Sequence, residues 1–148
     1  MSFETSKCTA RRLAQGHLLK LAGNGIDIGA GDDPFRPLSG VCRPWDKKSG
    51  GGDASELKGL EAGSLDYVYA SHCLEHLPDP VEALNRWADV IRSGGFMYVA
   101  VPDFDLYEGG GASATSSTRP LFHCTVRQIR RNRSTMWRRC FSEPCPQD

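Results

Sequence analysis

The sequence lacks three features that would each point to a particular class of protein. It has no long apolar run, so no secretory signal or membrane span is expected. Its six cysteines include no Cys-x-x-Cys pair, so no zinc site is expected and reduced thiols in the cytoplasm are favoured. The net charge is zero, with 18 basic and 18 acidic residues, which predicts no strong field for nucleic acid or a membrane.

The overall charge balance hides a basic C-terminal segment. Residues 111–148 hold seven arginines and no lysine, with only Glu143 and Asp148 as acids. The apolar periodicity stops where the low-complexity stretch GGGASATSSTRP (109–120) begins. We therefore expect a core at 1–110 and an irregular or disordered basic tail at 111–148. Binding of the clustered arginines to nucleic-acid phosphates is a less favoured alternative.

Alternating strands and helices predict a mostly parallel α/β sheet with flanking helices. Strands are expected at 25–29, 40–42, 65–71 and 96–102. Helices are expected at 9–22 and 79–95. The second helix is the clearer one, because Asp79 can cap it, Pro80 suits its first position and Gly94–Gly95 can end it.

The stretch GIDIGAGDDP (25–34) looks like a strand that enters a nucleotide-binding turn, but its charges disfavour the commonest nucleotides. A dinucleotide fingerprint needs a third glycine where this chain has Pro34. Asp32 and Asp33 would repel a diphosphate, and the proline removes an amide donor. No Gly-Lys-Ser/Thr is present. The sequence therefore disfavours a nicotinamide or flavin dinucleotide and excludes a Walker loop.

S-adenosyl-L-methionine suits the same turn better, because it has no phosphate and carries a sulfonium and an ammonium group. Gly29 and Gly31 would let the backbone approach this ligand closely. Asp27 lies inside the strand and needs partners if it is buried, which the ligand's ammonium or the loop amides would supply. A tight turn without a ligand is the alternative.

Further acids follow along the chain. Asp46 lies nineteen residues past Asp27, near the spacing at which an acid commonly holds the ribose hydroxyls. Asp53 and Ala54 follow a glycine-rich crossover and are candidates for contact with the adenine amino group. For both acids, a solvated loop position is the alternative interpretation.

Four segments carry a family resemblance, namely DIGAGDDP, GDA (52–54), LDYVYASHCLEHLPDPVEAL and RSGGFMYVAVPDFDLYE. Together they make the chain resemble the class I S-adenosylmethionine-dependent methyltransferases, and among them the type-11 methyltransferase domains. The resemblance implies a Rossmann-like fold, S-adenosyl-L-methionine as cofactor, and methyl transfer to an unidentified small-molecule or glycan-like acceptor. The candidate cofactor-binding residues are Asp27, Gly29, Ala30, Gly31, Asp46, Asp53, Ala54, Ser71 and His72.

His72 is also the candidate catalytic base, because an imidazole can take a proton from a hydroxyl or amine acceptor. The transfer itself needs mainly an in-line approach to the sulfonium methyl group. A structural role is the alternative, since His72 and His76 are spaced to share one side of a helical turn.

The resemblance is incomplete at its C-terminal end. A complete class I methyltransferase sheet has seven strands, the last two in an antiparallel hairpin, whereas the pattern here ends near Val101. We therefore expect a partial fold, with residues from about Gly110 onward as a frameshifted or misassembled remnant. A non-catalytic cofactor-binding fragment is the alternative to an active enzyme.

Overall fold

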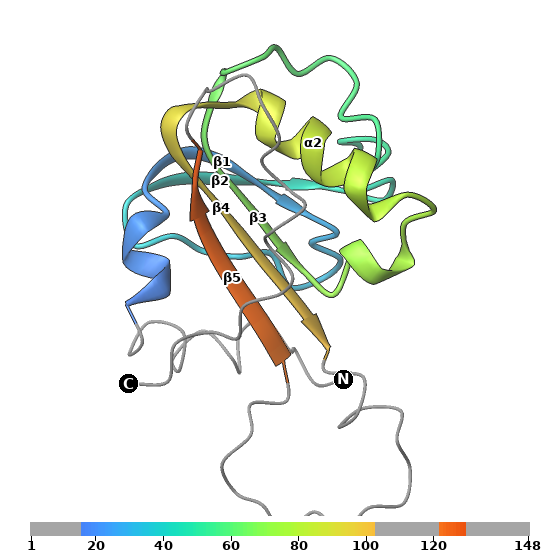
Figure 1. The fold of residues 1–148 in the computed structure, drawn as a ribbon, viewed down its shortest axis with the longest axis horizontal. Helices are drawn as coiled ribbons and strands as arrows, with labels where there is room; N and C mark the ends of the chain where they lie inside the picture. Colours follow the sequence, from blue (N-terminus) through green and yellow to red (C-terminus); the bar gives the residue numbers. More distant parts are fainter. Residues whose placement is uncertain (1–15, 103–121, 130–148) are drawn as a thin grey trace, which may run out of the picture.

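The computed structural model describes residues 16–102 and 122–129. Within these residues it contains a five-stranded sheet with the strand order β2-β1-β3-β4-β5 (Figure 1). The strands span Gly23–Ile28 (β1), Gly40–Trp45 (β2), Leu65–Ser71 (β3), Ile91–Pro102 (β4) and Phe122–Gln128 (β5). The first four strands are parallel and β5 is antiparallel to β4. This confirms the expected partial α/β fold with a mostly parallel sheet.

Helix α2, Pro80–Val90, lies across one face of the sheet (Figure 1). Its start agrees with the sequence prediction, because the Asp79 side chain accepts a hydrogen bond from the Glu82 backbone N–H at 2.9 Å. Its buried side chains include Leu84 and Trp87, which join one core cluster with Ile26 and Ile28 of β1. Helix α2 is therefore held by the packing of this buried face on the sheet.

The opposite face of the sheet carries a second core cluster that is rich in aromatic side chains. The Phe35 ring stacks on Tyr69 at 4.3 Å between centroids, and Tyr69 stacks on Tyr98 at 4.9 Å. Leu18 and Leu21, from the region of the 3-10 helix η1 (His17–Lys20), pack into the same cluster. Such offset aromatic contacts add to the area that the rings bury, and they fix the loop around Phe35 against the sheet.

Helix α2 ends earlier than the sequence predicted. It stops at Val90, and Gly94–Gly95 lie inside strand β4 instead of ending the helix. Gly94 N–H donates to the Ile129 carbonyl and Ile129 N–H donates to the Gly95 carbonyl, each at 2.8 Å. A Cβ on Gly95 would lie 2.3 Å from the Asp66 carbonyl oxygen. The two glycines therefore serve close strand contacts, which the helix prediction mistook for a terminal signal.

Two other elements differ from the predictions. Strand β2 continues to Trp45 instead of stopping at Cys42, because it pairs with the whole of β1. The expected helix at 9–22 lies mostly outside the described residues, and its described end contains the short 3-10 helix η1. Along the described chain, residues 46–64 form turns and contribute no strand, so β2 lies at an edge of the sheet.

The prediction of an irregular tail at 111–148 is wrong for Phe122–Gln128. These residues form β5, whose Val126 pairs with Tyr98 of β4. This segment forms a strand because its backbone pairs with β4. The sequence prediction relied on apolar periodicity, which is weak in this segment. The regular structure therefore extends past Val101, and the rest of the expected tail lies outside the described residues.

Candidate cofactor site

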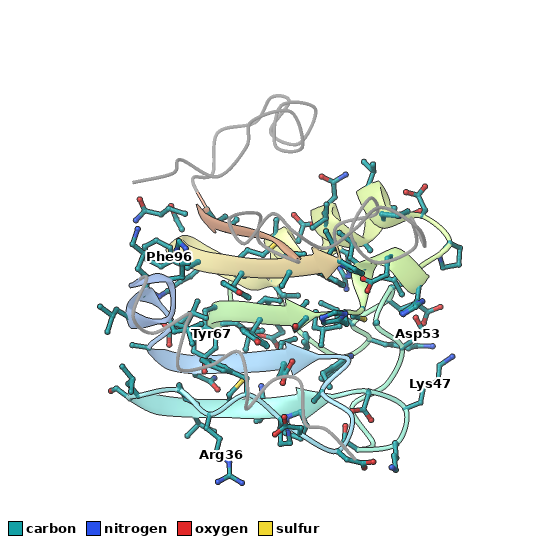
Figure 2. The ribbon with its side chains drawn as sticks, turned by 90° about the horizontal axis from the view of Figure 1, so that it is seen from below. Arg36, Lys47, Asp53, Tyr67 and Phe96 are labelled. Atoms are coloured by element: carbon teal, nitrogen blue, oxygen red, sulfur yellow. The ribbon has the colours of Figure 1, made fainter. Side chains whose placement is uncertain are left out.

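The strand order creates a place at the carboxyl ends of the strands where a ligand can bind. The chain leaves β1 toward β2 on one side, and β3 then pairs with the other side of β1. In open α/β sheets, ligands bind in the crevice at the carboxyl ends of the strands on either side of such a reversal. Figure 2 shows Lys47 and Asp53 beyond the carboxyl ends of the strands, with Phe96 at the opposite end. The loops that follow β1, β2 and β3 therefore form the candidate site.

The glycine turn directly follows β1, and its two glycines have different reasons to be glycine. Both have a left-handed backbone, with φ of 76° at Gly29 and 56° at Gly31. A Cβ on Gly29 would lie 2.8 Å from the Cβ of Cys73, so the loop after β3 packs directly against the turn. A Cβ on Gly31 would meet nothing within 4 Å. Gly31 therefore exposes its backbone to open space at the switch point.

Asp27 organises the loop that follows this turn. Its side chain is almost completely buried, with 2% of the residue exposed. One carboxylate oxygen accepts a hydrogen bond from the Phe35 backbone N–H at 2.7 Å. Of the two partners expected for this acid, the ligand's ammonium and the loop amides, the structure shows a loop amide. Asp27 thereby ties the end of this loop at Phe35 to strand β1.

Asp46, at the end of β2, reaches across to the glycine turn. Its Oδ2 accepts a hydrogen bond from Gly31 N–H at 3.1 Å, and its Oδ1 accepts one from Ser49 N–H at 2.6 Å. Desolvation raises the pKa of Asp46, but the hydrogen bonds from Ser49 and Gly31 outweigh it and bring the pKa below its usual value. Asp46 is therefore an ionised carboxylate beside the open side of Gly31.

Asp53 and Ala54 lie on the next loop, which two tryptophans attach to the core. The Trp45 indole N–H donates to the Asp53 carbonyl at 3.3 Å, and the Trp87 indole N–H donates to the Ala54 carbonyl at 2.7 Å. The Ser55 N–H, and after it Lys47, lower the pKa of the Asp53 carboxyl. The loop thus presents a second ionised carboxylate near the carboxyl ends of the strands.

The loop after β3 begins at Ser71 and changes direction sharply at His72. His72 has a left-handed φ of 56°, and its N–H donates to the Ala100 carbonyl at 3.0 Å. Its Nδ1 lies 3.7 Å from Oε1 of Glu75. The neighbouring Cys73 is buried, and burial followed by the charge of Glu75 raises the pKa of its thiol to about 11. The Cys73 thiol is therefore a packing group against Gly29 and not a nucleophile.

The structure thus brings three separate segments of predicted site residues together at the carboxyl ends of the strands. Gly31 and Asp46 are joined by a hydrogen bond, and the loop of His72 contacts the glycine turn through Cys73. The Asp53 side chain instead pairs with Lys47 and accepts a hydrogen bond from the Ser55 N–H. Sequence reasoning missed Cys73 and Trp87 as supports of the site, because both look like ordinary core residues in the sequence.

The described part of the chain contains neither a metal-binding cluster nor a membrane-spanning helix. Residues 16–102 and 122–129 hold no group of three or more His, Cys, Asp or Glu side chains placed to bind a metal ion. No helix in these ranges is long and apolar enough to cross a membrane.

Comparison with known proteins agrees with this arrangement. Residues 33–99 match the model of a methyltransferase domain family, and this match begins just after the glycine turn. YcgJ from Bacillus subtilis has a similar structure, with a TM-score of 0.51 and 19% identity over 62% of this chain and 50% of that protein. A putative sarcosine dimethylglycine methyltransferase from Galdieria sulphuraria gives 0.50 and 20%, over 66% and 46% of the two chains.

The share of each solved protein that this chain covers limits what these comparisons show. The chain spans about half the length of these two solved proteins, and at this identity they show the fold alone. No curated protein sequence matches the chain. The domain match, the strand order and the glycine turn after β1 nevertheless agree with the sequence resemblance. These findings support a class I S-adenosylmethionine-dependent methyltransferase domain, with a partial form of that fold and with S-adenosyl-L-methionine as the cofactor of the matched family.

Proposed function

We propose that this chain binds S-adenosyl-L-methionine at the carboxyl ends of β1 and β3 and transfers its methyl group to a small-molecule or glycan-like acceptor. The observation that carries the proposal is the open side of Gly31 next to the ionised Asp46 carboxylate. An exposed left-handed backbone lets a ligand approach closely, and the adjacent acid favours a cationic ligand without phosphate. The site therefore fits an adenosyl sulfonium better than a nucleotide.

Each predicted residue has a distinct part in this proposal. The backbone of Gly29, Ala30 and Gly31 would line the ligand, with Ala30 directing its side chain into the core at 8% exposure. Asp46 would accept hydrogen bonds from the ribose hydroxyls, because each carboxylate oxygen can accept more than one bond. Asp27 would act through the loop amide that it holds.

The other predicted contacts come from the loops after β2 and β3. Asp53 and Ala54 would face the adenine amino group, on a loop fixed by the two tryptophans. Ser71 and His72 would line the side toward the acceptor, because their loop packs on Gly29 through Cys73. Bound S-adenosyl-L-methionine would supply the electrophilic methyl group for the transfer.

Two alternatives predict different behaviour. A non-catalytic fragment would bind the cofactor without transferring the methyl group, and the coverage of about half of each solved relative motivates this alternative. A nucleic-acid-associated protein would depend on the C-terminal arginines, whose side chains lie outside the described residues. No observation in the described part of the chain favours that second alternative.

Calorimetric titration with S-adenosylhomocysteine tests the cofactor site. We expect micromolar binding by the wild-type chain and none of NADH, because the turn's acids repel a diphosphate. Gly31→Ala should weaken binding by at least about tenfold, since its methyl group would occupy the open side of the turn. Gly59→Ala is the matched control, because Gly59 also has a left-handed φ, 89°, and open space around its missing Cβ.

The two variants separate loss of the site from loss of stability. Each should cost about 1–2 kcal/mol of folding free energy, because alanine is strained in the left-handed region. Only Gly31→Ala should change the affinity. Equal affinities in Gly31→Ala and the wild type would contradict this placement of the cofactor, and a folded wild-type chain without affinity would contradict the proposed function.

A further inference from the structure

The loop after β2 presents two adjacent lysines that pair with acids on different loops of the site. Lys47 Nζ lies 3.1 Å from Asp53 Oδ2, and Figure 2 shows both residues beyond the carboxyl ends of the strands. Lys48 reaches the glycine turn instead, where its Nζ donates a hydrogen bond to Asp32 Oδ1 at 2.5 Å. The Lys48–Asp32 ion pair therefore joins the loop after β2 to the proposed cofactor turn.

This ion pair lies next to the place proposed for the ligand. Asp32 directly follows Gly31, whose open side is proposed to face the cofactor. Asp46, two residues before Lys48, accepts a hydrogen bond from Gly31 N–H at 3.1 Å, which brings the loop of Lys48 to the same position. Neighbouring Cα atoms are about 3.8 Å apart, so both charges of the pair lie within about 10 Å of the Gly31 Cα.

The two charges of the pair have opposite effects on a cationic ligand. The Asp32 carboxylate raises the pKa of Lys48 through its hydrogen bond and its charge, and Asp46 adds a smaller contribution. Lys48 is therefore protonated at neutral pH and opposes the field of Asp32. The Lys48 and Asp32 side chains are 73% and 67% exposed, so salt screens their effect on a ligand. A sulfonium bound at the turn competes with Lys48 for the field of the same carboxylate.

The cofactor and its product differ in the property that this ion pair can influence. S-adenosyl-L-methionine carries a sulfonium, whereas S-adenosylhomocysteine has a neutral thioether and otherwise lacks only the methyl group. A change of charge near the turn therefore alters the affinity for the first ligand more than for the second. A loss of loop structure would weaken the binding of both ligands. The ratio of the two affinities thus reports the electrostatic field at the turn.

We infer that Lys48 is a specificity-determining residue of the cofactor site, because it opposes Asp32 and thereby limits the preference of the turn for sulfonium over thioether. This inference rests on the proposed function, since it concerns the charge selectivity of the same site. At about 10 Å, a unit charge changes the affinity for a cation by about twofold in water, and by more where the effective dielectric constant is lower. Removal of the two members of the pair should change the preference in opposite directions.

Calorimetric titration with S-adenosyl-L-methionine and S-adenosylhomocysteine tests the inference in about 10 mM salt, where the screening length is about 30 Å. Lys48→Met should raise the affinity for S-adenosyl-L-methionine relative to S-adenosylhomocysteine by about two- to fivefold. Asp32→Asn should lower this ratio by a similar factor, and the double variant should return it close to the wild-type value. Lys48→Arg keeps the charge and should leave the ratio unchanged.

Arg92→Met is the matched control, because it also removes one positive charge from an ion pair at the surface. Arg92 Nε pairs with Asp66 Oδ1. Each of these residues is the second in its parallel strand, so the pair lies at the opposite end of the sheet from the glycine turn. From Asp66 to the end of β3 the strand rises about 17 Å. Arg92→Met should therefore change the ratio by less than about 1.5-fold.

The outcomes separate a role in charge selectivity from a structural one. An unchanged ratio in Lys48→Met would overturn the inference, and so would equal weakening of both ligands, which would make the pair a structural contact between loops. A change of ratio that persisted in about 1 M salt would also overturn it, because the screening length is then about 3 Å. If the folded wild-type chain bound neither ligand, the proposed function would be contradicted and this inference with it.

Discussion

Trp87 connects the core of helix α2 to the loop proposed to meet the adenine ring. Its side chain is fully buried, and its indole N–H donates to the Ala54 carbonyl at 2.7 Å. Trp87→Phe would leave that carbonyl unsatisfied, at a cost of about 1–3 kcal/mol. The smaller ring would add about 1 kcal/mol for lost packing, within the 3–5 kcal/mol typical of complete Trp truncation. We therefore expect the free energy of unfolding to fall by about 2–4 kcal/mol.

Urea unfolding followed by far-ultraviolet circular dichroism measures this loss. The midpoint should decrease while the m-value stays unchanged, which would show that the native state alone is affected. Arg86→Met is the matched control, because the Arg86 Nε–H donates to the Glu56 carbonyl of the same loop at 2.9 Å on the surface. That exposed bond should contribute less than about 1 kcal/mol. Equal losses in the two variants would refute the argument that the part-buried Trp87–Ala54 bond fixes the loop.

Two further predictions concern ionisable groups. The Asn24 N–H, and after it Arg92, lower the pKa of Asp66, so wild type should exceed Asp66→Asn in stability by about 1 kcal/mol above about pH 5. Because the folded-state pKa is the lower one, this difference should vanish as pH falls through it, and a pH-independent difference in urea midpoints would contradict the assignment. Burial raises the pKa of the Cys42 and Cys73 thiols to about 12 and about 11, so iodoacetamide should label them far more slowly in the folded chain than in urea. Peptide mass spectrometry measures both rates, and equal rates would show that these thiols are accessible in the native state.

The elements that the sequence predicted well are those fixed by local chemistry. Strand β3 coincides with its β-branched and aromatic run, and α2 begins where Asp79 and Pro80 indicated. The glycine turn also lies directly after β1, as expected. Each of these features is decided by residues close together in the sequence, so the local pattern was sufficient.

The elements that the sequence predicted badly depend on distant partners. Gly94–Gly95 looked like a helix end, but their backbone pairs with Ile129, which is far along the chain. Strand β5 forms in a segment with little apolar periodicity, because β4 offers an edge for antiparallel pairing. Patterns of neighbouring residues in the sequence cannot predict that β4 offers this edge. The contact of Cys73 with Gly29 was missed for the same reason, since two strands must first pair to bring these residues together.

The pairing of β1 with β3 is therefore the step that creates the candidate site. It places the loop of His72 on the glycine turn, and the pairing of β1 with β2 places Asp46 on Gly31. Both loops converge on one short segment, because β1 lies between the strands that follow it. A change that shifted the register of β3 by one residue would move Cys73 away from Gly29 and turn every side chain of the strand to the other face. The cofactor turn and the loop of His72 are thus coupled through the register of a single parallel strand pair.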